Sequence, residues 1–101
     1  MSSGFAGLLV VDLHFAATHS LKEKRAPLRS IKQHLRNAGC SVAEVAWHDA
    51  WQRSQLAISS VGRTMSDVSD RLDAAFHVCE RDPRVEVVIR QRTIVGLDEI
   101  E

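Results

Sequence analysis

The sequence predicts an α+β domain in which two helices pack on one face of a four-stranded antiparallel sheet. Four stretches alternate apolar and polar residues with the period of a strand, and two repeat apolar residues with the period of a helix. Turn and capping residues separate these stretches, which follow one another in the order β-α-β-β-α-β. Two right-handed crossovers in this order interleave the strands and produce a ferredoxin-like sandwich.

The first strand is expected over residues 5–15 and leads into the first helix. Ser20 can accept a backbone N–H of the first helical turn, and Glu23 can reach back to the N–H of Ser20, which is a capping box. Lys24 interrupts the apolar stripe at its exposed end, where its alkyl stem can lie along apolar surface. Pro27 permits either a kink or a later start of the helix, and Gly39 suits a left-handed cap at its end. The apolar stripe consists of Leu21, Leu28, Ile31 and Leu35.

A β-hairpin, a second helix and a last strand complete the pattern. The hairpin strands are expected over residues 41–48 and 55–61, which lie too close in sequence for a helix between them. Either Thr64 or Ser66 can cap the second helix, and Pro83 ends it because the residue before a proline avoids helical geometry. The last strand is expected over residues 84–95. The second helix has an apolar face made of Met65, Val68, Leu72, Ala75, Phe76 and Cys79.

Length and composition fit one domain in the cytoplasm. A chain of 101 residues, 45% of them hydrophobic, can bury a single core without cross-links. We expect residues 1–96 to form one ferredoxin-like domain and residues 97–101 to form a flexible acidic tail. Cys40 and Cys79 are far apart, which favours two reduced, buried thiols over a disulfide. The N-terminal stretch predicts neither a signal peptide nor a membrane span, because Asp12 interrupts it and no cation precedes Lys22.

A row of positive charge follows the first helix. The net charge of the chain is zero, yet residues 20–39 hold six Lys or Arg against one Glu. Five of these cations recur at spacings of three and four, so they share one helical face. Such a face could hold nucleic-acid phosphates, or it could be a solvated face balanced by the acidic second helix or by a partner subunit. The members of this basic stripe are Lys22, Arg25, Arg29, Lys32 and Arg36.

Trp51, Gln52 and Arg53 lie near the turn of the hairpin and are candidates for binding a partner. Tryptophan and arginine dominate the binding energy of many interfaces. The simpler expectation is that Trp51 packs at the base of the hairpin or in a dimer contact, because a large aromatic near a turn usually completes a core.

The open face of the sheet is expected to mix apolar and charged side chains. A second copy of the chain is the plainest cover for such a face, so we expect a homodimer. The expected charged and polar members are Asp12, His14, Glu44, His48, Glu86, Arg90 and Arg92, and the apolar ones are Leu8, Val10, Val42 and Val88.

The sequence does not favour an enzyme or a cofactor. Asp12, His14, Glu44, His48 and Asp49 could supply metal ligands, but they lack a close ligand spacing and the third strand separates their two strands. The glycines are too scattered for a phosphate-binding loop, and no serine lies in a nucleophile elbow. We therefore predict no catalytic residue, no metal and no cofactor.

Several short segments of the sequence are similar to segments of a known protein family. The most specific are residues 20–25, SLKEKR, and Asp49-Ala50-Trp51-Gln52-Arg53, while residues 13–14, 43–45 and 82–87 also fit. In this order they resemble the YlxP-like family of small bacterial domains of unknown function. The resemblance implies a ferredoxin-like fold, a dimer, and a cytoplasmic protein often encoded beside translation-initiation and ribosome-maturation factors. It implies no catalytic residues.

The expected function is that of a non-enzymatic, dimeric binding module. It would associate with RNA, the ribosome or the translation machinery through the basic stripe. An interaction protein that binds no nucleic acid is the alternative, followed by a small-ligand-binding protein or an enzyme that uses His14 and nearby carboxylates.

Overall fold

A computed structural model describes residues 3–99 and has the predicted order of elements. A last short 3-10 helix, Leu97–Glu99, follows the sheet. The other elements are β1 (Phe5–His14), α1 (Leu21–Asn37), β2 (Ser41–Ala46), β3 (Arg53–Gly62), α2 (Met65–Glu80) and β4 (Glu86–Gly96).

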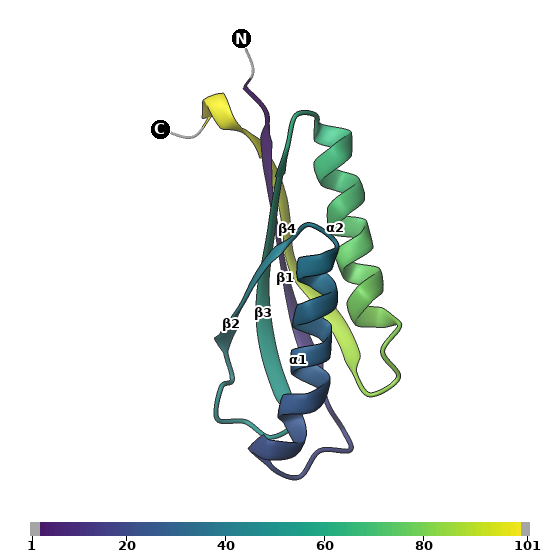
Figure 1. Ribbon diagram of the computed structural model, residues 1–101. Coiled ribbons are helices and arrows are strands. Elements are labelled where there is room, and N and C mark those ends of the chain that lie inside the picture. The colour runs from purple at the N-terminus through teal and green to yellow at the C-terminus, as the bar shows by residue number, and fades with distance from the viewer. Residues whose placement is uncertain (1–2, 100–101) are drawn as a thin grey trace.

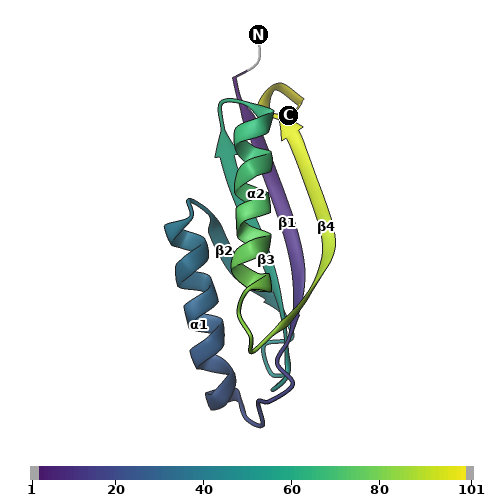
Figure 2. The same ribbon diagram turned by 90° about the vertical axis from the view of Figure 1, so that its right-hand side faces the viewer.

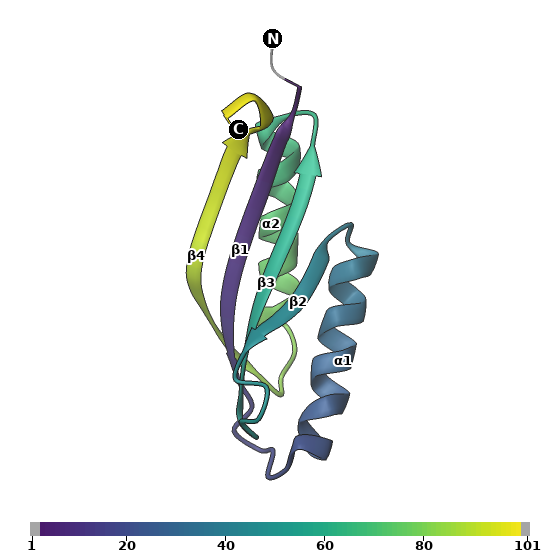
Figure 3. The ribbon, with the colours of Figure 1, turned by 90° about the vertical axis from the view of Figure 1, so that its left-hand side faces the viewer.

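The four strands form one antiparallel sheet in the order β2-β3-β1-β4. Both helices cover the same face, with α2 over the central strands and α1 over the β2 side (Figures 1 and 2). The opposite face carries no helix and is turned to the viewer in Figure 3. The ferredoxin-like α+β fold predicted from the order of elements is confirmed.

The core lies between the sheet and the two helices. The predicted inward face of β1 is confirmed, since Leu9, Val11 and Leu13 are at most 1% exposed. Phe15, just beyond the strand, is fully buried as well. Leu28, Ile31 and Leu35 of α1 and Val68, Leu72 and Ala75 of α2 meet these side chains. Cys40 and Cys79 are buried and both are free thiols. Burial, with Asp82 and Cys40 nearby, raises the pKa of Cys79 to about 12.

The ends of α1 follow the predicted capping, with one difference. The Ser20 hydroxyl accepts the N–H of Glu23, but the Glu23 carboxylate accepts the N–H of His19 and not that of Ser20. The helix begins at Leu21 and continues through the buried Pro27, so it has no later start. At its other end Gly39 has a φ of +85°, which glycine adopts without strain.

α2 is capped by Thr64, whose hydroxyl accepts the N–H of Asp67 at 3.1 Å. Of the two predicted caps, Thr64 and Ser66, the structure selects the first. The close approach of α2 to β1 depends on Gly7, where an added Cβ would lie 2.5 Å from a methyl group of Val68. This approach fixes α2 against the centre of the sheet.

In two strands, β2 and β4, some side chains lie on the opposite face of the sheet from the one predicted. Val42 and Glu44 were expected on the open face, but they lie opposite Ile58 and Leu56, both fully buried beneath the helices. Because antiparallel partners point to the same side of a sheet, both residues face the helices.

Arg92 is also on the helix side, contrary to the prediction. The register between β1 and β4 shifts after Val10, which pairs with Gln91, while Val11 pairs with Ile89. Arg90 is therefore an extra residue, and it reverses the alternation that follows. Arg92 instead donates to the Ser69 hydroxyl and pairs with Asp73 of α2, at 2.9 and 3.0 Å.

The C-terminal segment is partly ordered. The N–H of Leu97 donates to the carbonyl of Gly4 at 2.9 Å, so the beginning of the predicted tail lies against the N-terminal strand. Residues 100–101 of that tail lie outside the described residues. Neither described helix has the length and apolar character needed to cross a membrane.

Candidate functional site

The basic stripe lies along α1 on a surface that the chain leaves accessible. Lys22, Arg25, Arg29 and Arg36 are exposed, and Lys32 is half-buried. None of these five cations forms an ion pair with another residue in the described range 3–99. The prediction that they share one face agrees with the continuous helix α1. Among residues 3–99, no ion pair joins the stripe to an acidic residue of α2.

A groove runs between the stripe and the edge strand β2. One part, with a volume of about 380 Å³, has Leu28 as its apolar floor. A second hollow of about 180 Å³ shares Arg25, Leu28 and Glu44 with the first and continues toward His48. Together they make one channel, here called the basic groove, lined by Leu21, Lys24, Arg25, Leu28, Arg29, Lys32, Arg36, Glu44 and His48.

Lys24 is buried and fixes the loop between β2 and β3, although it was expected at the exposed end of the apolar stripe. Its side chain is only 4% exposed. The ammonium group lies 2.9 Å from each of three carbonyl oxygens, those of Trp47, Ala50 and Arg53. The Glu44 carboxylate lies 3.2 Å away and balances its charge. The sequence signal for a buried Lys24 was its position four residues before Leu28, which puts it on the apolar stripe of the helix.

Glu44 has two partners that keep it charged. The Ser54 hydroxyl donates to its carboxylate at 2.6 Å, and the Lys24 ammonium pairs with it. Burial alone raises the pKa of Glu44, but the hydrogen bonds from Ser54 and Lys24 and the positive charge of Lys24 outweigh burial and lower that pKa. The pair of charges is thus an internal support for the loop.

The loop of residues 47–53, here called the tryptophan loop, exposes two aromatic side chains. Trp47 directly follows β2 and has a φ of +67°, a left-handed conformation that is costly for a bulky residue. The Arg53 guanidinium covers one side of the Trp47 ring, 4.0 Å from its centre. Trp51 is 56% exposed, so it does not pack at the base of the hairpin as the simpler expectation held. Trp47 was predicted only as a residue of the strand over 41–48, because the alternation of apolar and polar residues gives no information on a positive φ.

Gln52 has a supporting role. Its side-chain amide donates to the backbone carbonyls of Ala16 and Thr18 at 3.2 and 3.1 Å. The backbone carbonyl of Gln52 accepts the N–H of Phe15 at 2.8 Å. The buried Thr18 hydroxyl lies 2.5 Å from the Trp51 carbonyl. These bonds fasten the tryptophan loop to the connection between β1 and α1. Of the three predicted partner-binding residues, Trp51 and Arg53 therefore have exposed side chains, while Gln52 is engaged within the chain.

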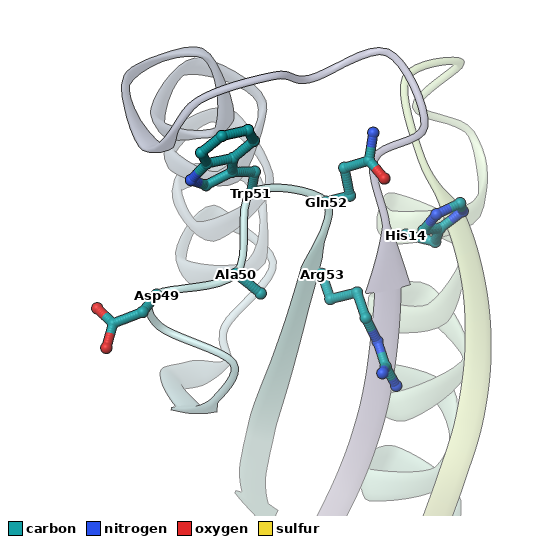
Figure 4. A pocket seen from close by; sticks show the side chains of 6 residues that line it. All are labelled: His14, Asp49, Ala50, Trp51, Gln52 and Arg53. Carbon is teal, nitrogen blue, oxygen red and sulfur yellow. The ribbon is translucent and has the colours of Figure 1, made fainter.

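A shallow cleft of about 410 Å³ adjoins the loop, but its side chains diverge. It is lined by His14, Asp49, Ala50, Trp51, Gln52 and Arg53. Figure 4 shows the Asp49 carboxylate pointing away from the His14 ring, and the Trp51 ring turned away from both His14 and Arg53. An acid–base pair requires side chains within hydrogen-bond reach of one reacting group, which this arrangement does not provide.

The side chains considered as metal ligands are separated and have other partners. Asp12 pairs with Arg90 at 2.9 Å and accepts the amide of Gln55, while Glu44 is held by Lys24 on the other face of the sheet. Across the described part of the chain, no group of three or more His, Cys, Asp or Glu residues is placed to hold a metal ion.

Comparison with known proteins gives two matches. Residues 6–92 match the model of a family described as a protein of unknown function, DUF503. The chain is also 31% identical over 71 residues to the uncharacterized protein YlxP of Bacillus subtilis (strain 168), a match that covers 69% of this chain and 77% of that protein. The family match spans the basic stripe, and the family's description gives no activity.

Proposed function

The chain belongs to the DUF503 family, and we propose that it is a non-enzymatic module that binds RNA of the translation machinery through the basic groove. The observation that carries this proposal is the state of the basic stripe. Its five cations share one face and have no ion-pair partner among residues 3–99. Like charges at these spacings cost roughly 0.2–0.5 kcal/mol per pair in a bare helix, and an anion placed opposite them removes that cost.

An extended polyanion fits the stripe better than a compact one. From Lys22 to Arg36 the stripe covers about 21 Å of helix, at about 1.5 Å per residue. The cations follow one another along this length, as successive phosphates do along a nucleic-acid backbone. We place the protein in the cytoplasm with its RNA, in agreement with the genomic setting that the family resemblance implies.

Charge reversal tests the groove. Arg25→Glu with Arg29→Glu should abolish retention of a labelled RNA at low salt, measured by fluorescence anisotropy. The matched control is Arg63→Glu with Arg81→Glu, which changes the charge equally at two exposed positions outside the groove. If five phosphate contacts form with a single strand, the slope of log K against log salt should be about −3.5. Equal loss in both double variants, or no binding by the wild type at low salt, would contradict the proposal.

A homodimer through the open sheet face is a second part of the proposal. Val88 of β4 is 56% exposed on this face, where Leu8 and Val10 are half-buried. Val61 of β3, 65% exposed, adds to the apolar area of this face, and the Arg90–Asp12 ion pair lies on the same face. A second copy placed on this face would bury the same patch on both subunits, as a two-fold interface requires.

Light scattering after size exclusion tests the dimer. The wild type should have the mass of two chains, and Val88→Glu should have the mass of one. Met65→Glu is the matched control, since Met65 is 54% exposed on α2 and away from the sheet face. A monomeric wild type, or a control variant that dissociates equally, would contradict this interface.

The second candidate function is an interaction protein that binds no nucleic acid. The exposed Trp51 favours it, because tryptophan side chains often anchor protein interfaces. Capture of partners from a lysate with and without nuclease separates the two functions. Partners that persist after nuclease treatment and depend on Trp51 would favour the protein-binding alternative.

A further inference from the structure

The tryptophan loop meets one end of the basic groove at His48. Trp47 and Trp51 are the two tryptophans in the sequence, which has no tyrosine. His48, which stands between them in the tryptophan loop, also lines the end of the groove together with Arg25. The Lys24 ammonium joins the first turns of α1 to the Trp47 carbonyl at 2.9 Å. The backbone of the tryptophan loop and the start of the cationic stripe are therefore held next to one another.

The loop holds its aromatic side chains in a costly arrangement. Trp47 has a positive φ and is still 44% exposed, and Trp51 is 56% exposed. Backbone strain of this kind persists where surrounding contacts fix it, and it is concentrated at binding sites. Here the buried Lys24 ammonium contacts three carbonyl oxygens of the loop, and the side-chain amide of Gln52 donates two further hydrogen bonds. A buried charge pair, Lys24–Glu44, thus supports a loop whose two tryptophan side chains are exposed to solvent.

We propose that the tryptophan loop is a base-stacking platform, so that the basic groove takes an unpaired RNA segment rather than a duplex. The inference rests on the proposed RNA-binding function and specifies its substrate class. In a single strand the faces of the bases are free to stack on aromatic side chains, whereas in a duplex they are covered by neighbouring base pairs. The backbone follows the cations of α1, and one or two bases stack on the exposed ring of Trp51.

Electrostatics alone predicts the opposite preference, which makes the inference testable. A duplex carries one charge per about 1.7 Å and a single strand one per about 3.4 Å, so a purely cationic groove favours the duplex. A preference for the single strand therefore has to come from contacts with bases.

The experiment uses the intact chain and its own fluorescence. A uridine oligonucleotide of about 12 residues, within the site sizes of single-strand binders, is compared with an RNA duplex of equal length. Since all tryptophan emission arises from the platform, the single strand should quench it and the duplex should not. Trp51→Ala should weaken binding of the single strand about 10-fold and leave duplex binding unchanged, while Trp51→Phe should retain most of the affinity.

The outcomes separate this inference from the proposed function. Binding of both RNAs with duplex preference, unchanged emission and no effect of Trp51→Ala would overturn the platform while leaving the basic groove intact. No binding of either RNA at low salt would overturn both. Quenching by the single strand that disappears with Arg25→Glu and Arg29→Glu, but not with Arg63→Glu and Arg81→Glu, would support both.

Discussion

The two helices have similar lengths, 17 and 16 residues, but they use their charges differently. On α2, Asp73 pairs with Arg92 and the Arg71 guanidinium donates to the Val61 carbonyl, so two of its charged side chains have partners in the sheet. On α1, the one buried cation, Lys24, has a full set of partners, whereas the exposed cations of the basic stripe have no ion pair within residues 3–99. The buried charge of α1 is balanced within the chain, whereas the five cations on one face of the same helix remain accessible to a ligand.

The largest expected effect comes from removing the internal charge of α1. Lys24→Met should lower the free energy of unfolding by about 3–5 kcal/mol, because it leaves Glu44 without its counter-ion in a mostly buried site. Lys22→Met, at an exposed position of the same helix, should change it by less than about 0.5 kcal/mol. Urea denaturation measures both. Similar small losses in the two variants would show that the buried pair does not support the loop.

A methyl group at Gly7 tests how closely α2 packs. Gly7→Ala should cost about 1–3 kcal/mol, since the new Cβ would lie 2.5 Å from Val68 and 3.0 Å from Leu72. Ser59→Ala on the exposed side of β3 is the control and should be nearly neutral. The melting temperatures of the two variants are compared by thermal unfolding. Equal melting temperatures would mean that α2 moves away from the added methyl group without loss of stability.

Acid should weaken the support of the tryptophan loop. The folded-state pKa of Glu44 lies below its ordinary value of 4.5, so its charged form stabilises the fold above that pH. This contribution is lost as the pH falls through the lowered folded-state pKa. Asp82 acts in the same direction, because hydrogen bonds from Arg84 lower its pKa. Unfolding free energies measured from neutral to acid pH should decline less steeply in Glu44→Gln than in the wild type, and identical curves would exclude Glu44 as a cause.

The smallest effect is expected on the surface of α2. The pair between Asp73 and Arg92 is partly exposed, with side chains 59% and 31% accessible. Asp73→Asn should therefore cost no more than about 1 kcal/mol. It also frees a cation on the α2 side of the molecule. RNA affinity in this variant should remain that of the wild type if the groove along α1 is the binding surface, and a marked gain would show that any unpaired cation suffices.

Local patterns were enough to predict the elements, their order and the fold. Ser20, Thr64 and Gly39 have capping roles that depend on a few neighbouring backbone groups, so their chemistry can be recognised from sequence. The basic stripe was likewise predictable, because helical spacing alone places its members on one face.

Features that depend on distant parts of the chain could not be predicted in this way. The burial of Lys24 requires carbonyl groups more than twenty residues away. The inward position of Arg92 results from the extra residue Arg90, which alternation within β4 does not reveal. The exposure of Trp51 reverses an expectation based on aromatic residues in general, since the loop is fastened by Lys24, Thr18 and Gln52 instead of by the tryptophan ring.

The shift of register at Arg90 has a counterpart on the opposite edge of the sheet. β2 also shifts its register, between Glu44 and Ala46, so both outer strands depart from regular pairing. Irregular, charged edges are poor templates for an incoming strand, and proteins use them to prevent aggregation through sheet edges. The two register shifts therefore disfavour the addition of a strand from another molecule to either edge of the sheet.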